Sequence, residues 1–173
     1  MRKPIQLIAV GDGVRLALLD RLSAELARVF GVSCHVRREV VDPSLAFDPS
    51  RRQFHSTAIL RMLAARLDAA RLLGVTESDL FVPILTYVFG EAQLEGDCAL
   101  VSLHRLHEEF YGLEADETRL LERLVKEAVH ELGHTFGLRH CPDWRCVMAS
   151  THAVERLDLK EAAFCPSCRR SVV

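Results

Sequence analysis

The chain has 173 residues, a length typical of one domain with a single hydrophobic core. Hydrophobic residues make up 49% and charged residues 27% of the sequence, which excludes a disordered tail. The net charge of -2 argues against nucleic acid or an anionic membrane surface as the main partner. The longest apolar runs, such as Leu80 to Val88, are much shorter than the roughly 20 residues needed to cross a bilayer.

The amino-terminal region alternates between strand and helix patterns. Ile5–Val10 is a largely apolar run that ends in a Gly-Asp-Gly turn, and it predicts a buried strand. Gln6 interrupts this run and no small-residue cleavage site follows, so we expect a cytoplasmic protein rather than an exported one. Val14–Phe30 predicts an amphipathic helix with leucines at every fourth position, and Cys34–Val41 predicts a second strand.

The next segments continue the alternation. A long helix is predicted from about Arg51 to Leu73, with Gly74 as its stop. Leu80–Phe89 predicts a strand in which Pro83 is a candidate bend, and Ala99–Leu103 predicts another strand. This order of strands and helices favours an α/β (α+β) protein in which helices pack on a sheet.

The segment after Asp116 has apolar residues at helical spacing, and it predicts a helix with one apolar row. His130 lies about 200° around this helix from Ala128, a member of the row, at 3.6 residues per turn. The apolar row therefore faces the core, while His130 and His134 face away from it toward a cleft.

The segment His130-Glu131-Leu132-Gly133-His134-Thr135-Phe136-Gly137-Leu138-Arg139-His140 has the spacing of a metal site. Histidines at i and i+4 project from one side of a helix and reach the same ion. We expect Gly137 to end the helix in a left-handed conformation and to bring His140 back as a third ligand. Glu131 points about 100° away from His130, so it is placed to take a proton from a metal-bound water without ligating.

Three imidazoles with an open fourth position are typical of a catalytic zinc site. Cobalt, nickel or iron would fit the same ligands in vitro. The five-residue core H-E-x-x-H also recurs by chance on amphipathic helices, but the full eleven-residue pattern is specific.

Four of the six cysteines fall close together near the carboxy terminus, at Cys141, Cys146, Cys165 and Cys168. Two close pairs separated by a longer gap predict a tetrahedral, structural zinc site. The alternatives are two disulfides or four unrelated buried thiols, and a chain with no export signal disfavours disulfides. We therefore expect two zinc ions per chain, one catalytic and one structural. The second ion would hold the segment that carries His140, so Cys165→Ala is expected to destabilise the fold.

The motif extends into a family resemblance. His130–His140 resembles the long metzincin consensus, and Met148 resembles the methionine of a Met-turn. The cysteine after the third histidine, the C-x4-C-x-M run and the final C-x2-C resemble the archaemetzincin family. Further similar stretches are Asp48–Phe54, Val88–Ala92 and Ser102–Leu106.

The resemblance implies a single metzincin-like zincin domain over residues 1–173. Its amino-terminal subdomain, 1–137, would hold a twisted mixed sheet, a backing helix and the active-site helix. Its carboxy-terminal subdomain, 138–173, would hold the Met-turn and the four-cysteine zinc site. The resemblance also implies an edge strand beside the cleft that pairs with an extended peptide, and we assign this strand to Ala99–Leu103.

The implied activity is zinc-dependent hydrolysis of peptide bonds, with Glu131 as general base and later proton donor, and Met148 as an apolar floor under the ligands. Many metzincins carry a tyrosine shortly after that methionine, and here none follows. His152 and Arg105 are candidate donors to the oxyanion in its place.

The missing tyrosine leaves other functions open. One is a zinc-stabilised peptide-binding module with little catalysis, and another is a non-peptide amidohydrolase. The expected partner is a peptide or protein substrate, with short peptides or exposed chain ends as the leading class, and we expect a monomer. His104 and His107 are interpreted as exposed or cleft-rim residues rather than as further ligands.

Overall fold

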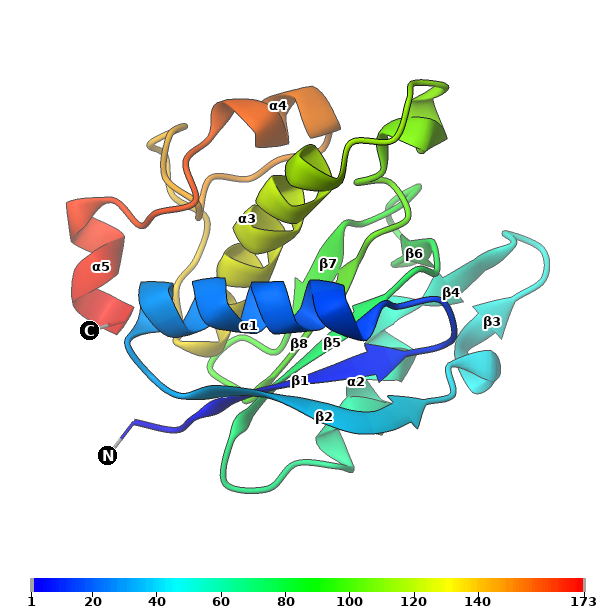
Figure 1. The fold of residues 1–173 in the computed structure, drawn as a ribbon, viewed down its shortest axis with the longest axis horizontal. Coiled ribbons are helices and arrows are strands. Elements are labelled where there is room, and N and C mark those ends of the chain that lie inside the picture. The colour runs from blue at the N-terminus through cyan, green and yellow to red at the C-terminus, as the bar shows by residue number, and fades with distance from the viewer. Residues whose placement is uncertain (1, 173) are drawn as a thin grey trace.

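The computed structural model describes residues 2–172, so Met1 and Val173, the ends of the predicted domain, lie outside it. Within these residues a five-stranded sheet with the order β2-β1-β5-β8-β7 forms the centre of the molecule (Figure 1). The first four strands in this order are parallel, and β7 is antiparallel to β8 at one edge. The strands are β1 (Ile5–Val10), β2 (Cys34–Val41), β5 (Arg71–Thr76), β7 (Gly90–Ala92) and β8 (Cys98–Ser102). The expected mixed sheet of an α/β protein is confirmed.

Both faces of this sheet are covered by helices, as Figure 1 shows. In β1, Leu7 and Ala9 belong to the core that contains α1 (Leu16–Phe30) and α3 (Glu117–Thr135). Ile8 and Val10 belong to the opposite core, which contains α2 (Ser56–Ala64). Successive side chains of a strand point to opposite faces, so a sheet covered on both sides favours strands that are apolar on both faces, as β1 is apart from Gln6.

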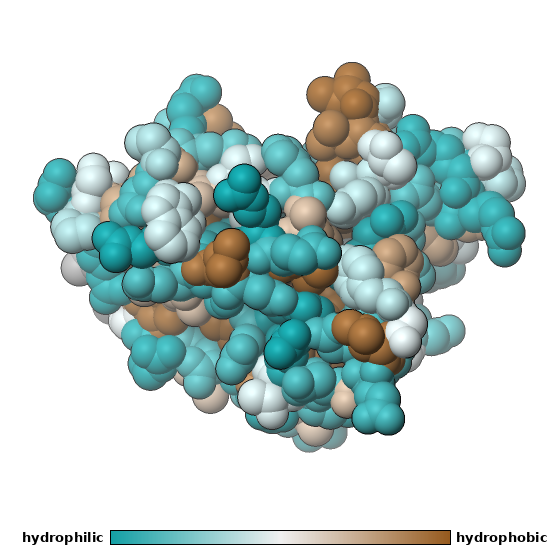
Figure 2. All heavy atoms as spheres, turned by 90° about the horizontal axis from the view of Figure 1, so that it is seen from above, coloured by the Kyte–Doolittle hydropathy of each residue, from teal (hydrophilic) through white to brown (hydrophobic). Residues whose placement is uncertain are grey.

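Smaller elements surround the central sheet. A three-stranded sheet has the order β3-β4-β6, and the carboxy-terminal segment lies beside α3 and the end of α1 (Figure 1). On the face drawn in Figure 2, separate hydrophobic groups lie among hydrophilic residues. Among residues 2–172, none of the helices has the length and apolar character that a membrane span requires. The remaining elements are β3 (Phe47–Asp48), β4 (Gln53–His55), β6 (Leu80–Phe81), the 3-10 helices η1 (Ser44–Ala46) and η2 (Glu108–Tyr111), α4 (Val154–Leu159) and α5 (Pro166–Val172).

The long helix predicted over residues 51–73 is wrong. The helix α2 spans only Ser56–Ala64, and Arg71–Thr76 forms β5 in the middle of the sheet. Gly74 therefore lies inside a strand and stops no helix. A Cβ atom on Gly74 would lie 2.7 Å from Cδ1 of Leu63, so this glycine allows α2 to approach β5 closely.

The strand predicted over Leu80–Phe89 is also wrong beyond its first two residues, which form β6. The chain turns at Pro83, which has no N–H to give to a strand ladder, and the Leu85 N–H donates to the Val82 carbonyl (3.0 Å). The chain then returns beside β6, where the Val88 N–H donates to the Leu80 carbonyl (3.0 Å). We call residues 82–89 the cleft loop.

The edge strand of the sheet differs from the one predicted. The predicted strand at Ala99–Leu103 corresponds to β8 (Cys98–Ser102), which is paired with β5 on one side and with β7 on the other. β8 is buried throughout and apolar except for Ser102 at its end, as expected for an interior strand. The strand at the edge is β7 (Gly90–Ala92), directly after the cleft loop.

Candidate active site and metal centres

The helix α3 carries the segment with the three histidines, and its sequence explains both of its ends. Asp116 caps the amino-terminal end, where its carboxylate accepts a hydrogen bond from the Arg119 N–H (2.9 Å). The helix ends at Thr135, and Gly137 has a φ of 85°, which is the predicted left-handed conformation. The Leu138 N–H donates to the Gly133 carbonyl (3.2 Å) and turns the chain back toward the helix.

The structure brings the three imidazoles together. The Nε2 atoms of His130 and His134 are 3.1 Å apart, and the ring of His140 lies 5.3 Å and 5.2 Å from theirs between centroids. One ligand nitrogen from each ring lies within 4.8 Å of the other two. Zinc–nitrogen bonds of about 2.0–2.1 Å at tetrahedral angles imply nitrogen separations of roughly 3.3 Å. The three side chains therefore fit a single zinc ion.

Backbone carbonyls orient two of these rings. His130 Nδ1 donates to the Val147 carbonyl (2.8 Å), and His134 Nδ1 donates to the Leu138 carbonyl (2.7 Å). A proton fixed on Nδ1 leaves Nε2 with a free lone pair, which is the form that binds a metal. Burial lowers the pKa of His130 well below its ordinary value, and the cation of Lys160 adds to this effect. Burial also lowers the pKa of His134 and of His140, so all three favour the neutral form.

Glu131 lies beside this cluster, and an edge glycine makes room for it. Its side chain is buried between α3 and β7, where a Cβ atom on Gly90 would lie 2.7 Å from the Glu131 Cγ and 2.6 Å from the Leu100 carbonyl oxygen. Burial raises the pKa of Glu131 well above its ordinary value, and the negative charge of Glu127 adds to the rise. A carboxyl group with a raised pKa, placed beside a metal centre, is suited to accept and return a proton.

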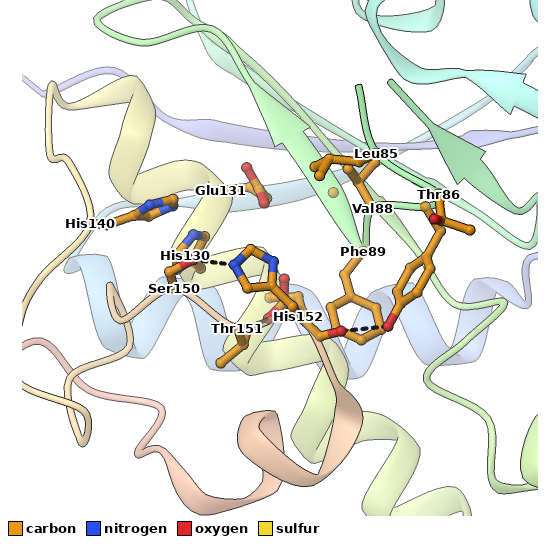
Figure 3. Close-up of a pocket in the computed structure, with 13 residues that line it drawn as sticks. Leu85, Thr86, Val88, Phe89, His130, Glu131, His140, Ser150, Thr151 and His152 are labelled. Carbon is orange, nitrogen blue, oxygen red and sulfur yellow. Dashed lines mark hydrogen bonds between the residues drawn. The ribbon is translucent and has the colours of Figure 1, made fainter. Parts of the chain in front are cut away.

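A cleft of about 330 Å³ opens over these residues (Figure 3). The cleft loop and Gly90 form one wall, and the chain after Met148 forms the other. His130, Glu131 and His140 lie at its floor, together with Glu127 from one turn earlier in α3. The wall residues are Leu85, Thr86, Tyr87, Val88, Phe89 and Gly90 on one side and Ser150, Thr151 and His152 on the other.

Met148 lies under the helix, in a tight turn. The Ala149 N–H donates to the Cys146 carbonyl (2.9 Å) and closes the turn, and the side chain of Met148 is fully buried. A Cβ atom on Gly133 would lie 2.4 Å from the Met148 sulfur, so the methionine packs against α3 between the positions of His130 and His134. A side chain at residue 133 would displace this turn from the helix.

The four carboxy-terminal cysteines form a second cluster. The sulfur atoms of Cys141, Cys146, Cys165 and Cys168 lie within 4.8 Å of one another, and those of Cys141 and Cys165 are 3.8 Å apart. A disulfide requires about 2.05 Å, whereas zinc–sulfur bonds of about 2.3 Å at tetrahedral angles imply roughly 3.8 Å. A backbone hydrogen bond from Cys168 lowers the pKa of Cys165 to about 7, which favours the thiolate. The cluster fits a closed zinc site and contains no disulfide.

Sequence reasoning missed a buried ion pair next to the cleft. Lys160 has a fully buried side chain, and its Nζ lies 3.5 Å from the Glu127 carboxylate and donates to the Ala149 carbonyl (3.3 Å). Burial raises the pKa of Glu127, and the Lys160 cation opposes this rise. Glu127 and Glu131 share an i, i+4 spacing that could have indicated a second carboxylate, but no sequence signal indicates Lys160.

Three other residues considered from the sequence lie outside the cleft. His107 Nε2 pairs with the Glu77 carboxylate (2.9 Å), and His104 packs its ring against Phe110. The guanidinium of Arg105 donates two hydrogen bonds to Asp79, at 2.7 and 2.8 Å, so it is directed away from the three imidazoles. Of the two candidate oxyanion donors, only His152 lines the cleft.

Comparisons with known proteins show which family the chain resembles. Residues 58–173 match the model of peptidase family M54. An archaemetzincin from Methanocaldococcus jannaschii is 42% identical over 163 residues, which cover 94% of this chain and 89% of that protein. The crystal structure of a zinc-dependent peptidase from Methanocorpusculum labreanum superimposes with a TM-score of 0.90 at 32% identity, covering 98% of this chain and 100% of that one.

A crystal structure of archaemetzincin from Archaeoglobus fulgidus, complexed with malonate, superimposes with a TM-score of 0.83 at 36% identity. It covers 97% of this chain and 99% of that chain. The relatives therefore match almost the whole length of the chain, and the family match spans the positions of both candidate clusters. The chain belongs to peptidase family M54, the archaemetzincins, and is a zinc metallopeptidase.

Proposed function

We propose that this protein hydrolyses peptide bonds at a zinc ion held by His130, His134 and His140, with Glu131 as the general base. The observation that carries the proposal is the convergence of three neutral imidazoles at the floor of an open cleft, with a buried carboxyl group beside them. This arrangement provides three protein ligands and leaves space for solvent and substrate, as catalytic zinc sites do.

A zinc ion held by His130, His134 and His140 would supply Lewis acidity and would lower the pKa of a bound water toward about 7. Glu131 takes one proton from the water as its oxygen attacks the carbonyl carbon of the scissile bond. The same carboxyl group then gives that proton to the departing amine nitrogen. Gly90 supports this role because only the absence of a side chain there leaves room for Glu131.

We further propose that the four cysteines hold a second, structural zinc ion. Cys141 follows His140 directly, and its N–H donates to the Met148 carbonyl (2.9 Å). A closed site at the cysteines would therefore fix the segment that carries both His140 and Met148. In this proposal Met148 is the Met-turn residue, and residues 138–173 form a small subdomain attached to the subdomain of residues 1–137.

The substrate class is peptides, and the proposed place for the peptide backbone is the free edge of β7. Gly90, Glu91 and Ala92 pair with β8 on one side only, and β7 borders the imidazole cluster. An exposed strand edge offers N–H and C=O groups to an extended peptide. Because thiolates persist in reducing compartments, we also propose the cytoplasm as the site of action.

The test compares peptide turnover by the zinc-loaded protein and its Glu131→Ala variant on a broad peptide library. General base catalysis contributes about 10²- to 10⁴-fold, so the variant should lose at least that much in kcat. Zinc analysis should give two ions per chain for both proteins, which separates lost chemistry from lost metal. Equal turnover by the two proteins, or none by either, would contradict hydrolysis by Glu131, and binding without turnover would favour a peptide-binding module.

A further inference from the structure

Amide hydrolysis passes through a tetrahedral adduct whose oxyanion requires a positioned hydrogen-bond donor. No tyrosine follows the turn that contains Met148. We propose that His152 donates a hydrogen bond to this oxyanion, and that Tyr87, from the opposite wall of the cleft, positions His152. This inference rests on the peptide hydrolysis proposed above and adds a second residue, from the wall of the cleft formed after Met148, that acts on the substrate.

His152 is placed for this role. Figure 3 shows its ring directed into the same cleft as His130 and Glu131, from the wall formed after Met148. One ring nitrogen, Nε2, lies 3.2 Å from the Ser150 hydroxyl. The ring is exposed to the cleft rather than buried among other side chains, so a substrate group has access to it.

Tyr87 fixes the backbone of His152 from across the cleft. The Tyr87 hydroxyl donates to the His152 carbonyl at 2.5 Å, although 65 residues separate them in sequence. The Tyr87 ring is held in turn, because the guanidinium of Arg105 lies 4.0 Å above its centroid. Arg105 is itself fixed by two hydrogen bonds to Asp79. Arg105 thus contributes to the cleft by holding Tyr87.

Both walls that carry these residues are anchored. Arg51 donates to the Leu85 carbonyl (2.6 Å), and Gln53 donates to the Thr86 carbonyl (3.0 Å), which fixes the cleft loop before Tyr87. On the other wall, the buried Glu127–Lys160 pair holds the carbonyl of Ala149 and the hydroxyl of Thr151. A donor on such a segment is oriented before the substrate binds, and orientation in advance is what makes an oxyanion donor effective.

The chemistry assigns His152 a hydrogen bond and no proton transfer. When the water oxygen bonds to the carbonyl carbon, the π electrons move onto the carbonyl oxygen, which accepts the hydrogen bond from a ring N–H of His152. When the adduct collapses, this oxygen re-forms the double bond. The C–N bond breaks, its electron pair stays on nitrogen, and the amine takes the proton that Glu131 holds.

The experiment uses the zinc-loaded protein and a phosphinic tripeptide, in which a tetrahedral phosphinate replaces the scissile amide. The reference ligand is the amide tripeptide of the same sequence, whose binding is measured in the Glu131→Gln background. Removal of one oxyanion donor costs about 10²-fold or more, so His152→Ala should lower kcat and phosphinate affinity by that factor. Affinity for the amide tripeptide should stay unchanged. Tyr87→Phe should lose about tenfold in the same two quantities, as expected for one hydrogen bond.

One control variant accompanies these measurements. His35→Ala removes an exposed histidine on β2, outside the cleft, and should behave as wild type. The assignment would be overturned if His152→Ala kept its phosphinate affinity, or if it lost affinity equally for the phosphinate and the amide tripeptide. A larger loss of phosphinate affinity in Tyr87→Phe than in His152→Ala would also overturn it. Absence of turnover by the wild type would instead overturn the hydrolysis, while phosphinate affinity would still report on His152.

Discussion

At the scale of single residues, the cleft depends on close contacts between residues that are far apart in the chain. Gly90 lies on β7 and Glu131 on α3, and the missing side chain of the glycine is the space that the carboxyl group occupies. Across the cleft, the Tyr87 hydroxyl donates a hydrogen bond to the His152 carbonyl. Such contacts position the side chains that we propose as catalytic, through neighbours that have no proposed role in the chemistry.

The substitution Gly90→Ala tests this dependence. The added methyl group would clash with Glu131 and with the Leu100 carbonyl, so we expect a loss of about 1–3 kcal/mol in unfolding free energy. We also expect about 10²-fold lower kcat, because Glu131 is displaced from the cleft floor. Gly74→Ala is the matched control, since it is crowded by Leu63 away from the cleft and should lose stability while kcat is kept. Equal kcat values for the two variants would contradict the role of Gly90.

A second residue-scale prediction concerns pH. The hydrogen bond to Glu77 raises the pKa of His107, and the charges of Glu77, Glu109 and Glu117 support this rise. A raised folded-state pKa gives stability that is fully present below the unfolded value near 6.5 and is lost as pH increases through the folded value.

Unfolding free energies from urea titrations at several pH values between 5.5 and 8.5 check this sign. The difference between wild type and His107→Gln should be largest at the acidic end and should shrink as pH rises, by about 1 kcal/mol or less for this partly exposed pair. A difference that grows with pH would show that the sign is wrong.

The residues that could be predicted from the sequence are those with local spacing. The i, i+4 histidines, the turn at Gly137 and the paired cysteines all follow from the geometry of a helix or a metal site. Lys160, Gly90 and Tyr87 could not be predicted, because their roles arise from contacts across the fold. Arg105 and His152 were equivalent candidates in sequence, and only the pairing of Arg105 with Asp79 separates them.

At the scale of elements, α3 connects the sheet to the carboxy-terminal segment. Its buried Arg123 donates two hydrogen bonds to Asp158 in α4, both of 2.7 Å. The same guanidinium donates to Glu108 in η2 (2.9 Å) and to the Leu106 carbonyl (2.8 Å). One side chain thereby joins three elements near the amino-terminal half of the helix.

The substitution Arg123→Met removes this connection and leaves the buried Glu108 carboxylate with the partly exposed Arg119 as its cationic partner. Loss of one partner from a buried ion pair costs about 3–5 kcal/mol, and we expect a decrease of that size in unfolding free energy. Arg28→Met is the control, because Arg28 pairs with Glu25 at the surface and its loss should not be measurable. A loss below about 1 kcal/mol for Arg123→Met would refute the connecting role.

Element boundaries were predicted well where hydrophobic periodicity and turn residues agree, as for β1, β2, α1 and α3. The prediction of a helix over residues 51–73 is wrong at its end, where Leu72, Leu73 and Val75 belong to a strand. A short apolar run of this kind is equally typical of a buried helix and of a central strand. Gly74 was interpreted as a helix stop, whereas it permits close packing in the sheet. The position of β8 inside the sheet depends on strand order, which a single sequence does not encode locally.

At the scale of the whole molecule, two clusters of candidate metal ligands lie close together around the chain that follows α3. The imidazole cluster takes two residues from α3 and one from the chain after it, and the cysteine cluster takes all four residues from that later chain. Because His140 and Cys141 are adjacent, the two sites share one stretch of backbone. We therefore expect a zinc ion bound by the four cysteines to fix the geometry of the three imidazoles.

The most direct test is a crystal structure of the zinc-loaded protein with anomalous diffraction data collected at the zinc edge. We expect two zinc peaks among residues 2–172. One should lie about 2.0–2.1 Å from a nitrogen of each of His130, His134 and His140, with a position left open to the cleft. The other should lie about 2.3 Å from four cysteine sulfur atoms. The proposed catalytic site would be contradicted if the first peak were absent or if His140 were turned away from that zinc ion. A fourth protein ligand that closed the ion to solvent would contradict it as well.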